Sequence, residues 1–191
     1  MRKVSLLAGA LASGALAATA IASIHVAVVN PTFTTPTAGI APGTPAVTAP
    51  DCSVPQPGWS ASDHWTTYAN DIHASIASWL TLAPDGTPAN LVAVGGGQSG
   101  LVQVLAPQFK ETDVNRVSAM VYVLGGQASL QIGDGGSGGG AVAVSSTERT
   151  WEMISACGRS DMRNNEIVVY GVGPAVFYVS SVKVAFDPTC P

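Results

Sequence analysis

The sequence predicts an all-β fold, specifically a two-sheet antiparallel β-sandwich with jelly-roll topology and about ten strands. Glycine (21 residues) and proline (13 residues) are plentiful and lie between apolar stretches, as the many turns of such a fold require. The closing segment alternates in polarity, with Phe177 and Val179 on one face. It returns to that face at Val182 after one extra residue at Ser180-Ser181, which indicates a β-bulge. No stretch after the N-terminal apolar run has sustained helical periodicity, which argues against a mainly helical domain.

Residues 1–22 are predicted to be a secretory signal peptide. Arg2-Lys3 precede an uncharged stretch, Val4–Ile24, that is dominated by Ala, Leu and Gly and contains two overlapping A-x-A cleavage patterns near its end. The alternative is an uncleaved membrane anchor, because the stretch is nearly long enough to cross a bilayer. Its many small residues make it only weakly apolar, so we expect cleavage between Ile21 and Ile24 and a secreted, extracellular protein.

Residues 24–191 are expected to form a single β-sandwich domain. A first strand is predicted at Ile24–Asn30, followed by a long Pro-rich loop over 31–58. Trp59–Tyr68 and Ile72–Trp79 are rich in aromatic, Thr and Ile residues and are predicted to be strands. The second of these also has several Ala and Ser residues, so a short helix is the alternative there.

The later strands have clearer signals. Ala128, Leu130 and Ile132 alternate with polar residues, as in a strand with one buried face and one wet face. The other strands are short runs rich in Val, Ile and aromatic residues that end at turn residues. The strands predicted in this part are Leu91–Val94, Leu101–Ala106, Val117–Leu124, Ala128–Ile132, Ala141–Ser145, Thr150–Ser155, Ile167–Tyr170 and Val176–Phe186.

The charge balance excludes two classes of partner. The whole chain has 8 basic and 12 acidic residues. Cleavage of the signal peptide removes two basic residues and leaves a net charge of −6. An acidic chain without a basic cluster is not expected to bind nucleic acid, nor a membrane once the signal peptide is gone.

Three cysteines, Cys52, Cys157 and Cys190, are an odd number for an exported chain. One disulfide and one free thiol is the simplest arrangement. We expect the bridge between Cys52 and Cys190, because both lie in Pro-flanked segments near the ends and their bridge would hold the two ends together. Without a C-x-x-C motif, a structural metal site is not expected.

Two glycine-rich segments match chemical motifs only formally. Gly95–Gly100 fits G-x-G-x-x-G, but a nucleotide site needs a helix after the last glycine, and the β-branched run that follows predicts a β-hairpin loop instead. Gly135–Gly139 fits G-x-S-x-G, but a nucleophile elbow needs a tight strand-to-helix turn, and this run joins two predicted strands. Neither segment predicts an enzyme.

Two polar pairs, Asp63-His64 and Asp71/His73, are candidates for metal ligands or acid–base pairs. Adjacent residues on a strand point to opposite faces, so Asp63 and His64 are poorly placed to act together. Asp71 and His73 share a face in a strand, but two ligands are too few for a metal site. Solvated polar side chains are the expected role.

Aromatic residues gather in a polar, charge-poor segment that contains Trp59, Trp65, Tyr68 and Trp79. Indole and phenol rings stack on the CH-rich faces of sugars, while polar side chains take the hydroxyls. The segment is therefore a candidate sugar platform, and the alternative for each ring is a place in the core. Trp151 alternates with polar neighbours and is predicted to be a core residue.

The chain resembles the jelly-roll carbohydrate-binding modules of the galactose-binding-like superfamily, especially the xylan- and glucan-binding type. The likeness covers Asn30 to Phe186. Its landmarks, in order, are Asn30-Pro31-Thr32-Phe33-Thr34, Trp59, Gly100-Leu101-Val102-Gln103-Val104, Val117–Tyr122, Thr150-Trp151 and Phe177-Tyr178-Val179-Ser180-Ser181-Val182-Lys183-Val184.

The resemblance raises two points, which are whether a structural calcium site is expected and where a ligand would bind. Where the family has an acidic residue in the opening motif and an acidic pair in the closing motif, this chain has Thr34 and Ser180-Ser181. Both losses argue against a structural calcium site, which usually needs carboxylates, and no other cofactor is expected. The family's cleft is lined by aromatics and amides on a concave sheet, and its first and last strands pair in one sheet.

The function predicted from the sequence is an exported, non-catalytic carbohydrate-binding module whose partner is a polysaccharide or oligosaccharide. The predicted ligand contacts are ring stacking on Trp65, Tyr68 and Trp79 and amide hydrogen bonds from Gln103 and Asn70. The alternative is an extracellular surface or matrix interaction protein with the same fold and no sugar binding. A small lyase or hydrolase comes third.

Overall fold

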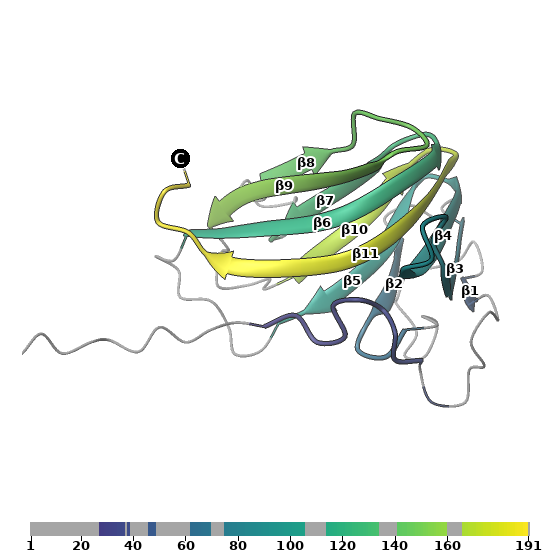
Figure 1. Cartoon of the computed structure of the whole chain (residues 1–191), viewed down its shortest axis with the longest axis horizontal. Helices are drawn as coiled ribbons and strands as arrows, with labels where there is room; N and C mark the ends of the chain where they lie inside the picture. The colour runs from purple at the N-terminus through teal and green to yellow at the C-terminus, as the bar shows by residue number, and fades with distance from the viewer. Residues whose placement is uncertain are drawn as a thin grey trace, which may run out of the picture.

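The computed structural model describes residues 27–36, 38, 46–48, 62–69, 75–105, 114–133, 141–159 and 166–190. In these ranges eleven strands form two antiparallel sheets that pack face to face, and no helix is present (Figure 1). The predicted all-β sandwich is confirmed. No helical segment in the same ranges has the length and hydrophobicity needed to cross a bilayer. The predicted signal peptide, Cys52, Trp59, Asn70 and the 135–139 motif lie outside the described residues.

The six-stranded sheet has the strand order β1-β3-β4-β11-β6-β9. Its strands are β1 (Ala46–Thr48), β3 (Ser75–Leu82), β4 (Pro88–Gly96), β6 (Val114–Gly125), β9 (Trp151–Arg159) and β11 (Ala175–Phe186). The five-stranded sheet has the order β2-β5-β10-β7-β8. Its strands are β2 (Thr66–Ala69), β5 (Gln98–Val104), β7 (Ala128–Ile132), β8 (Ala141–Val144) and β10 (Glu166–Val172).

The last eight strands have jelly-roll topology. Taken in chain order, the first of them pairs with the last, β4 with β11, and the second with the seventh, β5 with β10. The third pairs with the sixth, β6 with β9, and the fourth with the fifth, β7 with β8. This nesting of pairs defines the jelly roll and confirms the predicted wiring.

The core lies between the inner faces of the two sheets. Strand β6 illustrates why: every second residue from Val117 to Val123 is fully buried, and the residues between them face outward. Phe177 and Val179 of β11 meet Val121 and Val123 across the strand pair and are also fully buried. The period of two in the sequence therefore places one face of each strand in the core.

The segment before β1 is not the predicted strand. Residues 27–30 form no strand, because Asn30 and Phe33 have positive φ angles of 49° and 57° and the chain turns there. Asn30 holds the turn through its side chain: Oδ1 accepts a hydrogen bond from the Thr35 N–H at 3.0 Å, and Nδ2 donates to the Thr35 carbonyl at 2.9 Å. The turn inserts the fully buried Phe33 into the core. We call residues 27–36 the N-terminal strap.

Two further expectations near the N-terminus differ from the structure. Strand β1 lies inside the predicted loop 31–58. It belongs to the same sheet as β11, as the resemblance implies, but it pairs with β3 at the sheet edge and not with β11.

The glycine run between β4 and β5 is a crossover and not the predicted hairpin loop, because β4 and β5 belong to different sheets. Gly97 makes the change of direction with a φ of 64°. A Cβ on Gly100 would lie 2.0 Å from the Val169 carbonyl oxygen, so the close approach of β5 to β10 requires a glycine there. A strand follows the run, and not the helix that a nucleotide site needs.

The predicted bulge in β11 is confirmed. The register against β6 shifts between Ser180 and Lys183, and Ser181 has a φ of 56°. Val182 returns to the core, fully buried, and its N–H donates a hydrogen bond to the Pro31 carbonyl of the N-terminal strap at 2.8 Å. The extra residue therefore restores the buried face and docks the strap.

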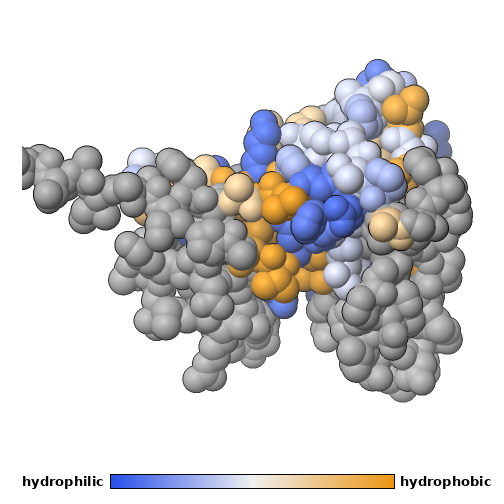
Figure 2. Space-filling view, turned by 90° about the horizontal axis from the view of Figure 1, so that it is seen from below, coloured by the Kyte–Doolittle hydropathy of each residue, from blue (hydrophilic) through white to orange (hydrophobic). Residues whose placement is uncertain are grey.

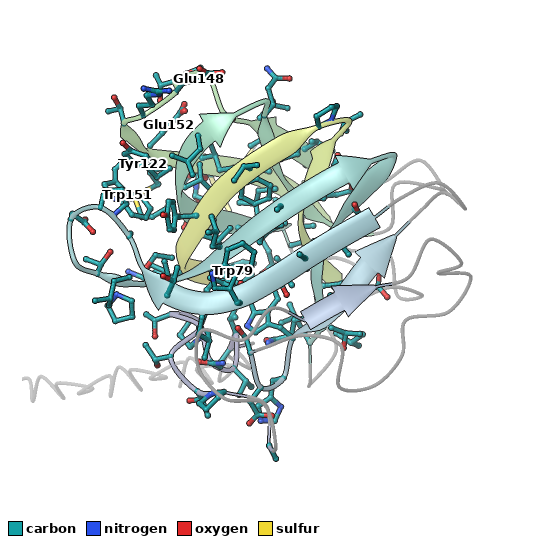
Figure 3. All side chains as sticks on the ribbon, turned by 90° about the vertical axis from the view of Figure 1, so that its right-hand side faces the viewer. Trp79, Tyr122, Glu148, Trp151 and Glu152 are labelled. Carbon is teal, nitrogen blue, oxygen red and sulfur yellow. A yellow bond between two sulfur atoms is a disulfide. The ribbon has the colours of Figure 1, made fainter. Side chains whose placement is uncertain are left out.

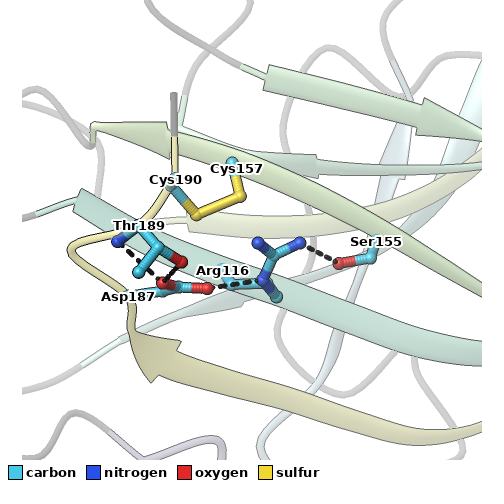
Figure 4. The surroundings of a disulfide bond; sticks show 6 residues. All are labelled: Arg116, Ser155, Cys157, Asp187, Thr189 and Cys190. Atoms are coloured by element: carbon cyan, nitrogen blue, oxygen red, sulfur yellow. Dashed lines mark hydrogen bonds and ion pairs between the residues drawn. A yellow bond between two sulfur atoms is a disulfide. The ribbon is translucent and has the colours of Figure 1, made fainter.

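The predicted Cys52–Cys190 disulfide is wrong, because Cys190 is bonded to Cys157, with Cα atoms 5.6 Å apart (Figure 4). After β11 the chain turns back over β6, where the Asp187 N–H donates to the Val114 carbonyl at 2.9 Å. Cys157 lies on β9, the other neighbour of β6, and pairs with Arg116. The turn thus brings Cys190 beside Cys157 on β9. The expectation of a Cys52–Cys190 bridge rested only on the positions of these two cysteines near the chain ends, which contain no information about this turn.

Candidate functional site

Four aromatic side chains lie in one line across the outer face of the six-stranded sheet. Trp79 on β3 pairs with Leu91 on β4, which pairs with Tyr178 on β11. Tyr178 pairs with Tyr122 on β6, and Tyr122 pairs with Trp151 on β9. We call Trp79, Tyr178, Tyr122 and Trp151 the ring row. It crosses five neighbouring strands, a span of about 19 Å at the usual strand spacing.

All four rings are half-buried, and three of them contact through Tyr122, whereas Trp79 is separated from Tyr178 by Leu91 and also packs against the core. The Tyr122 ring centroid lies 5.7 Å from that of Trp151 and 6.0 Å from that of Tyr178, at interplanar angles of 61° and 71°. These are edge-to-face contacts, which hold aromatic rings in fixed relative orientations. Figure 3 shows Tyr122 and Trp151 side by side, with Trp79 further along the same sheet.

An ordered loop closes the β9 end of the row. The Glu152 carboxylate accepts four hydrogen bonds, from the backbone and hydroxyl groups of both Ser146 and Thr147, at 2.7–3.1 Å. These bonds, led by the one from the Ser146 hydroxyl, lower the pKa of Glu152 below its ordinary value. The Arg149 N–H donates to the Val123 carbonyl at 2.7 Å, so the loop is also tied to β6. Glu148 and Glu152 lie beyond Tyr122 and Trp151 in Figure 3.

Trp65, a predicted stacking residue, lies in the core. Its side chain is only 4% exposed, and its ring centroid lies 4.7 Å from that of Phe33. The indole Nε1–H donates to the Asn30 carbonyl at 3.1 Å. Both ring faces are covered, which differs from the exposed platform expected from the sequence. Trp65 fastens the N-terminal strap, which lies along the lower side of the molecule in Figure 1.

Gln103, a predicted ligand amide, is engaged with the protein. Its carbonyl oxygen accepts a hydrogen bond from the Val29 N–H, and its amide nitrogen donates to the Val29 carbonyl, both at 2.8 Å. The same nitrogen also donates to the His64 carbonyl at 3.1 Å. Both amide hydrogens are therefore used, and the side chain acts toward Val29 as a neighbouring strand would. Figure 2 looks onto the molecule from the side of this strap and shows hydrophobic and hydrophilic residues next to each other.

The predicted contact residues are not brought together. Tyr68 lies on β2 and pairs with Gly100 in the five-stranded sheet, whereas Trp79 lies on the six-stranded sheet. Of the predicted contact residues that the structure describes, Trp79 is the one that joins the ring row. The prediction that Trp151 is a core residue is wrong, because it is half-buried on the outer face.

Tyr122, Tyr178 and Trp151 were missed by the sequence reasoning. A signal for the two tyrosines exists, because each stands between two apolar residues of a strand and therefore points away from the core. What the sequence does not contain is the register that aligns β3, β11, β6 and β9 and so turns four separate rings into one row.

The expectation that Asp63 and His64 point apart on a strand is wrong, because they lie in a turn and His64 Nε2 is 3.4 Å from Asp63 Oδ2. Both side chains are exposed, and Asp71 and His73 lie outside the described residues. The Ser180 hydroxyl donates to the Pro88 carbonyl at 3.0 Å, so the closing motif does not fit a calcium site. Among the described residues the one group with metal-ligand spacing is Cys157, Asp187 and Cys190, and both of its sulfurs form the disulfide.

No family model matches the chain, and no curated protein does. Solved structures similar to this chain include carbohydrate-binding modules, a bacteriophage tailspike domain and an exo-β-agarase. The family 11 module of the cellulosomal cellulase Lic26A-Cel5E of Clostridium thermocellum is 14% identical, with a TM-score of 0.49, over 65% of this chain and 88% of that one. The CBM22-1 xylan-binding domain of Paenibacillus barcinonensis Xyn10C is 12% identical, with a TM-score of 0.42, over 76% of this chain and 96% of that one.

A third similar structure is the N-terminal cellulose-binding domain of β-1,4-glucanase C from Cellulomonas fimi. It is 13% identical, with a TM-score of 0.41, over 77% of this chain and 97% of that one. Likenesses this distant do not bear on the function. The jelly-roll topology is shown by the strand pairing, and the ring row is the feature that bears on the function.

Proposed function

We propose that the protein is an exported, non-catalytic carbohydrate-binding module and that the ring row is its ligand-binding surface. The observation that supports the proposal is the single register line that aligns four aromatic side chains on one sheet face. Sugar rings pack their CH-rich faces against indole and phenol rings. In a row that crosses five strands, successive aromatic rings can stack against successive sugar units of one polymer chain.

The charges around the row favour an uncharged ligand. On β3, β4, β11 and β6, the residues of the ring-row line and their neighbours two positions along each strand are uncharged. Glu148 and Arg149, one of each charge, lie at the β9 end just before Trp151, and Lys183 and the Arg116–Asp187 ion pair lie further along the strands. Because four of the five strands present no charge at the rings, we propose a neutral polysaccharide or oligosaccharide.

A binding role is favoured over a catalytic one by the state of Glu152. Glu152 already accepts four hydrogen bonds, and its lowered pKa keeps it ionised at neutral pH. A general acid for glycosidic cleavage needs a raised pKa. The Glu152 carboxylate, next to Trp151 in the sequence, is therefore unsuited to acid catalysis and suited to holding a loop.

The test is a screen of the mature protein against immobilised neutral and acidic plant, fungal and bacterial glycans, followed by chromatography of the sugars in solution. We expect binding to neutral glycans and no release of shorter sugars. Binding to no glycan would contradict the proposal, and released sugars would contradict its non-catalytic part.

The alternative, an extracellular interaction protein with the same fold, is favoured by a separate observation. Val142 and Val144 are 47% and 46% exposed next to each other on the outer face of β8, the edge strand of the five-stranded sheet. Exposed apolar residues on one sheet face suit a protein partner. This alternative predicts that replacing these valines with Thr abolishes partner binding and that ring-row variants do not.

A further inference from the structure

The ring row stands between lines of small side chains. Next to Trp79 and Leu91 on one side are Ala77 and Ala93, which pair with each other. On the other side are Thr81 and Ala89, which also pair with each other. Residues of one face that follow each other along a strand are about 7 Å apart, so these small side chains lie directly beside the rings.

The same relief continues on β11. Tyr178 is preceded on its face by Val176 and followed by Ser180, which is only 9% exposed. Over β3, β4 and β11 the residues of the row are therefore larger than those of both neighbouring lines, and the row forms a ridge there whose β3 end, Trp79, also packs against the core. The relief becomes lower toward β9, where Met120 and Met153 flank the row. Met153 is 67% exposed and widens the apolar surface there.

A ridge and a groove suit different forms of the same polymer. A single chain in solution buries most of its surface only when a site surrounds it. A chain that lies along a ridge is touched from one side, and the flanking alanines are too short to reach it. A surface of packed chains contacts the ridge and its flanks together, and the solid has already lost the conformational freedom that a soluble chain loses on binding.

We propose, building on the proposed function, that the ring row recognises the surface of a packed, insoluble, uncharged polysaccharide and not single soluble chains. The row is suited to this because it is held rigid. Tyr122 contacts rings on both sides, at 5.7 and 6.0 Å, and the loop at the β9 end is tied to Glu152 and to β6. A rigid surface needs no further ordering when it meets a solid.

The experiment compares the two physical forms of one polymer. The mature protein is incubated with microcrystalline cellulose, insoluble xylan and chitin, and depletion from solution gives the affinity for each solid. Calorimetry with cellohexaose, xylohexaose and chitohexaose gives the affinity for each soluble chain. We expect at least one solid to bind about tenfold or more tighter than its hexamer, a difference of roughly 1.4 kcal/mol or more.

Matched variants locate the binding. Trp79→Ala and Trp151→Ala should release the protein from the solid, whereas Phe186→Ala should not. Phe186 is a suitable control because it is a 54% exposed aromatic residue at the end of β11, away from the row. Retention of binding in both tryptophan variants would overturn the ridge proposal.

The remaining outcomes separate the two proposals. A hexamer that binds as tightly as its solid would overturn the ridge proposal and leave the proposed function standing. Binding to neither form of any tested neutral polymer would contradict both. Sedimentation that shows a dimer abolished by Tyr122→Ala would assign this face to a second copy of the chain and would also overturn both.

Discussion

At the residue scale, Trp65 and Trp151 have the same side chain in two different environments. Trp65 is 4% exposed, packs on Phe33 and donates a hydrogen bond to the Asn30 carbonyl. Trp151 is half-buried on the outer face of β9, and its Nε1 is buried without a hydrogen-bond partner. The first indole therefore contributes packing and a hydrogen bond to the fold, and the second contributes mainly a surface.

Trp65→Ala should destabilise the protein by about 3–5 kcal/mol, because it leaves a cavity and removes the indole hydrogen bond to the Asn30 carbonyl, which keeps its bond from the Phe33 N–H. Trp151→Ala should cost roughly half as much, since less of its area leaves water on folding. Denaturant unfolding of both variants with the disulfide intact measures the two costs. A larger cost at Trp151 would contradict the assignment of Trp65 to the core and Trp151 to the surface.

Asp187 links stability to pH through its contacts around the disulfide. Hydrogen bonds from Thr189 and Arg116 lower the pKa of Asp187 from 3.8 to about 2 (Figure 4). A depressed pKa stabilises the fold above the ordinary value, and the stabilisation is lost as the pH falls through the folded-state value. Asp187→Asn should therefore reduce stability at neutral pH, and the difference from wild type should shrink progressively as the pH falls from about 5 to about 1. Unfolding curves across this range measure it, and a difference that does not change with pH would rule out this linkage.

At the element scale, the bulge in β11 has a residue in an unfavourable backbone conformation. Ser181 has a φ of 56°, in the left-handed region where residues other than glycine are strained. Ser181→Gly should stabilise the protein by up to about 1 kcal/mol, and Ser181→Val should destabilise it. Thermal unfolding of the pair checks the sign of each change. A stabilising valine would show that the positive φ is not required.

The disulfide constrains the path between β9 and the C-terminal turn. Cys157 and Cys190 are 33 residues apart, and closing a loop of this length contributes about 3–4 kcal/mol in the chain-entropy model. Cys157→Ser and Cys190→Ser should each remove this contribution, and Cys52→Ser should not. Unfolding with and without reductant measures the change, and peptide mapping that links Cys52 to either other cysteine would contradict the pairing.

The strands were predictable from the sequence wherever one face is buried. Ala128–Ile132 has the predicted bounds, but its expected wet face is wrong, because Ser129 and Gln131 are buried as well. The bulge at Ser180-Ser181 was visible as a break in the period of two. The segment 27–30 was not predictable, because Val29 is bonded by a side chain 74 residues away. Local pattern contains no information about such a contact.

At the scale of the whole molecule, the jelly roll creates the candidate site. Trp79 and Trp151 are brought into one line because β11, the last strand, lies between β4 and β6. The aromatic content of the sequence indicates a candidate platform. The sequence does not show that Trp65 and Gln103 are already engaged in tertiary contacts. Their side chains fasten the N-terminal strap, through Asn30 and Val29.

The affinity of single ring-row variants for the polysaccharide identified by the glycan screen tests the central claim most directly. Trp79→Ala, Tyr178→Ala, Tyr122→Ala and Trp151→Ala should each weaken binding by about 1–3 kcal/mol, by analogy with other aromatic anchors, with the fold retained. Phe186→Ala should leave the affinity unchanged. Wild-type affinity in all four folded variants would show that the ring row is not the binding surface.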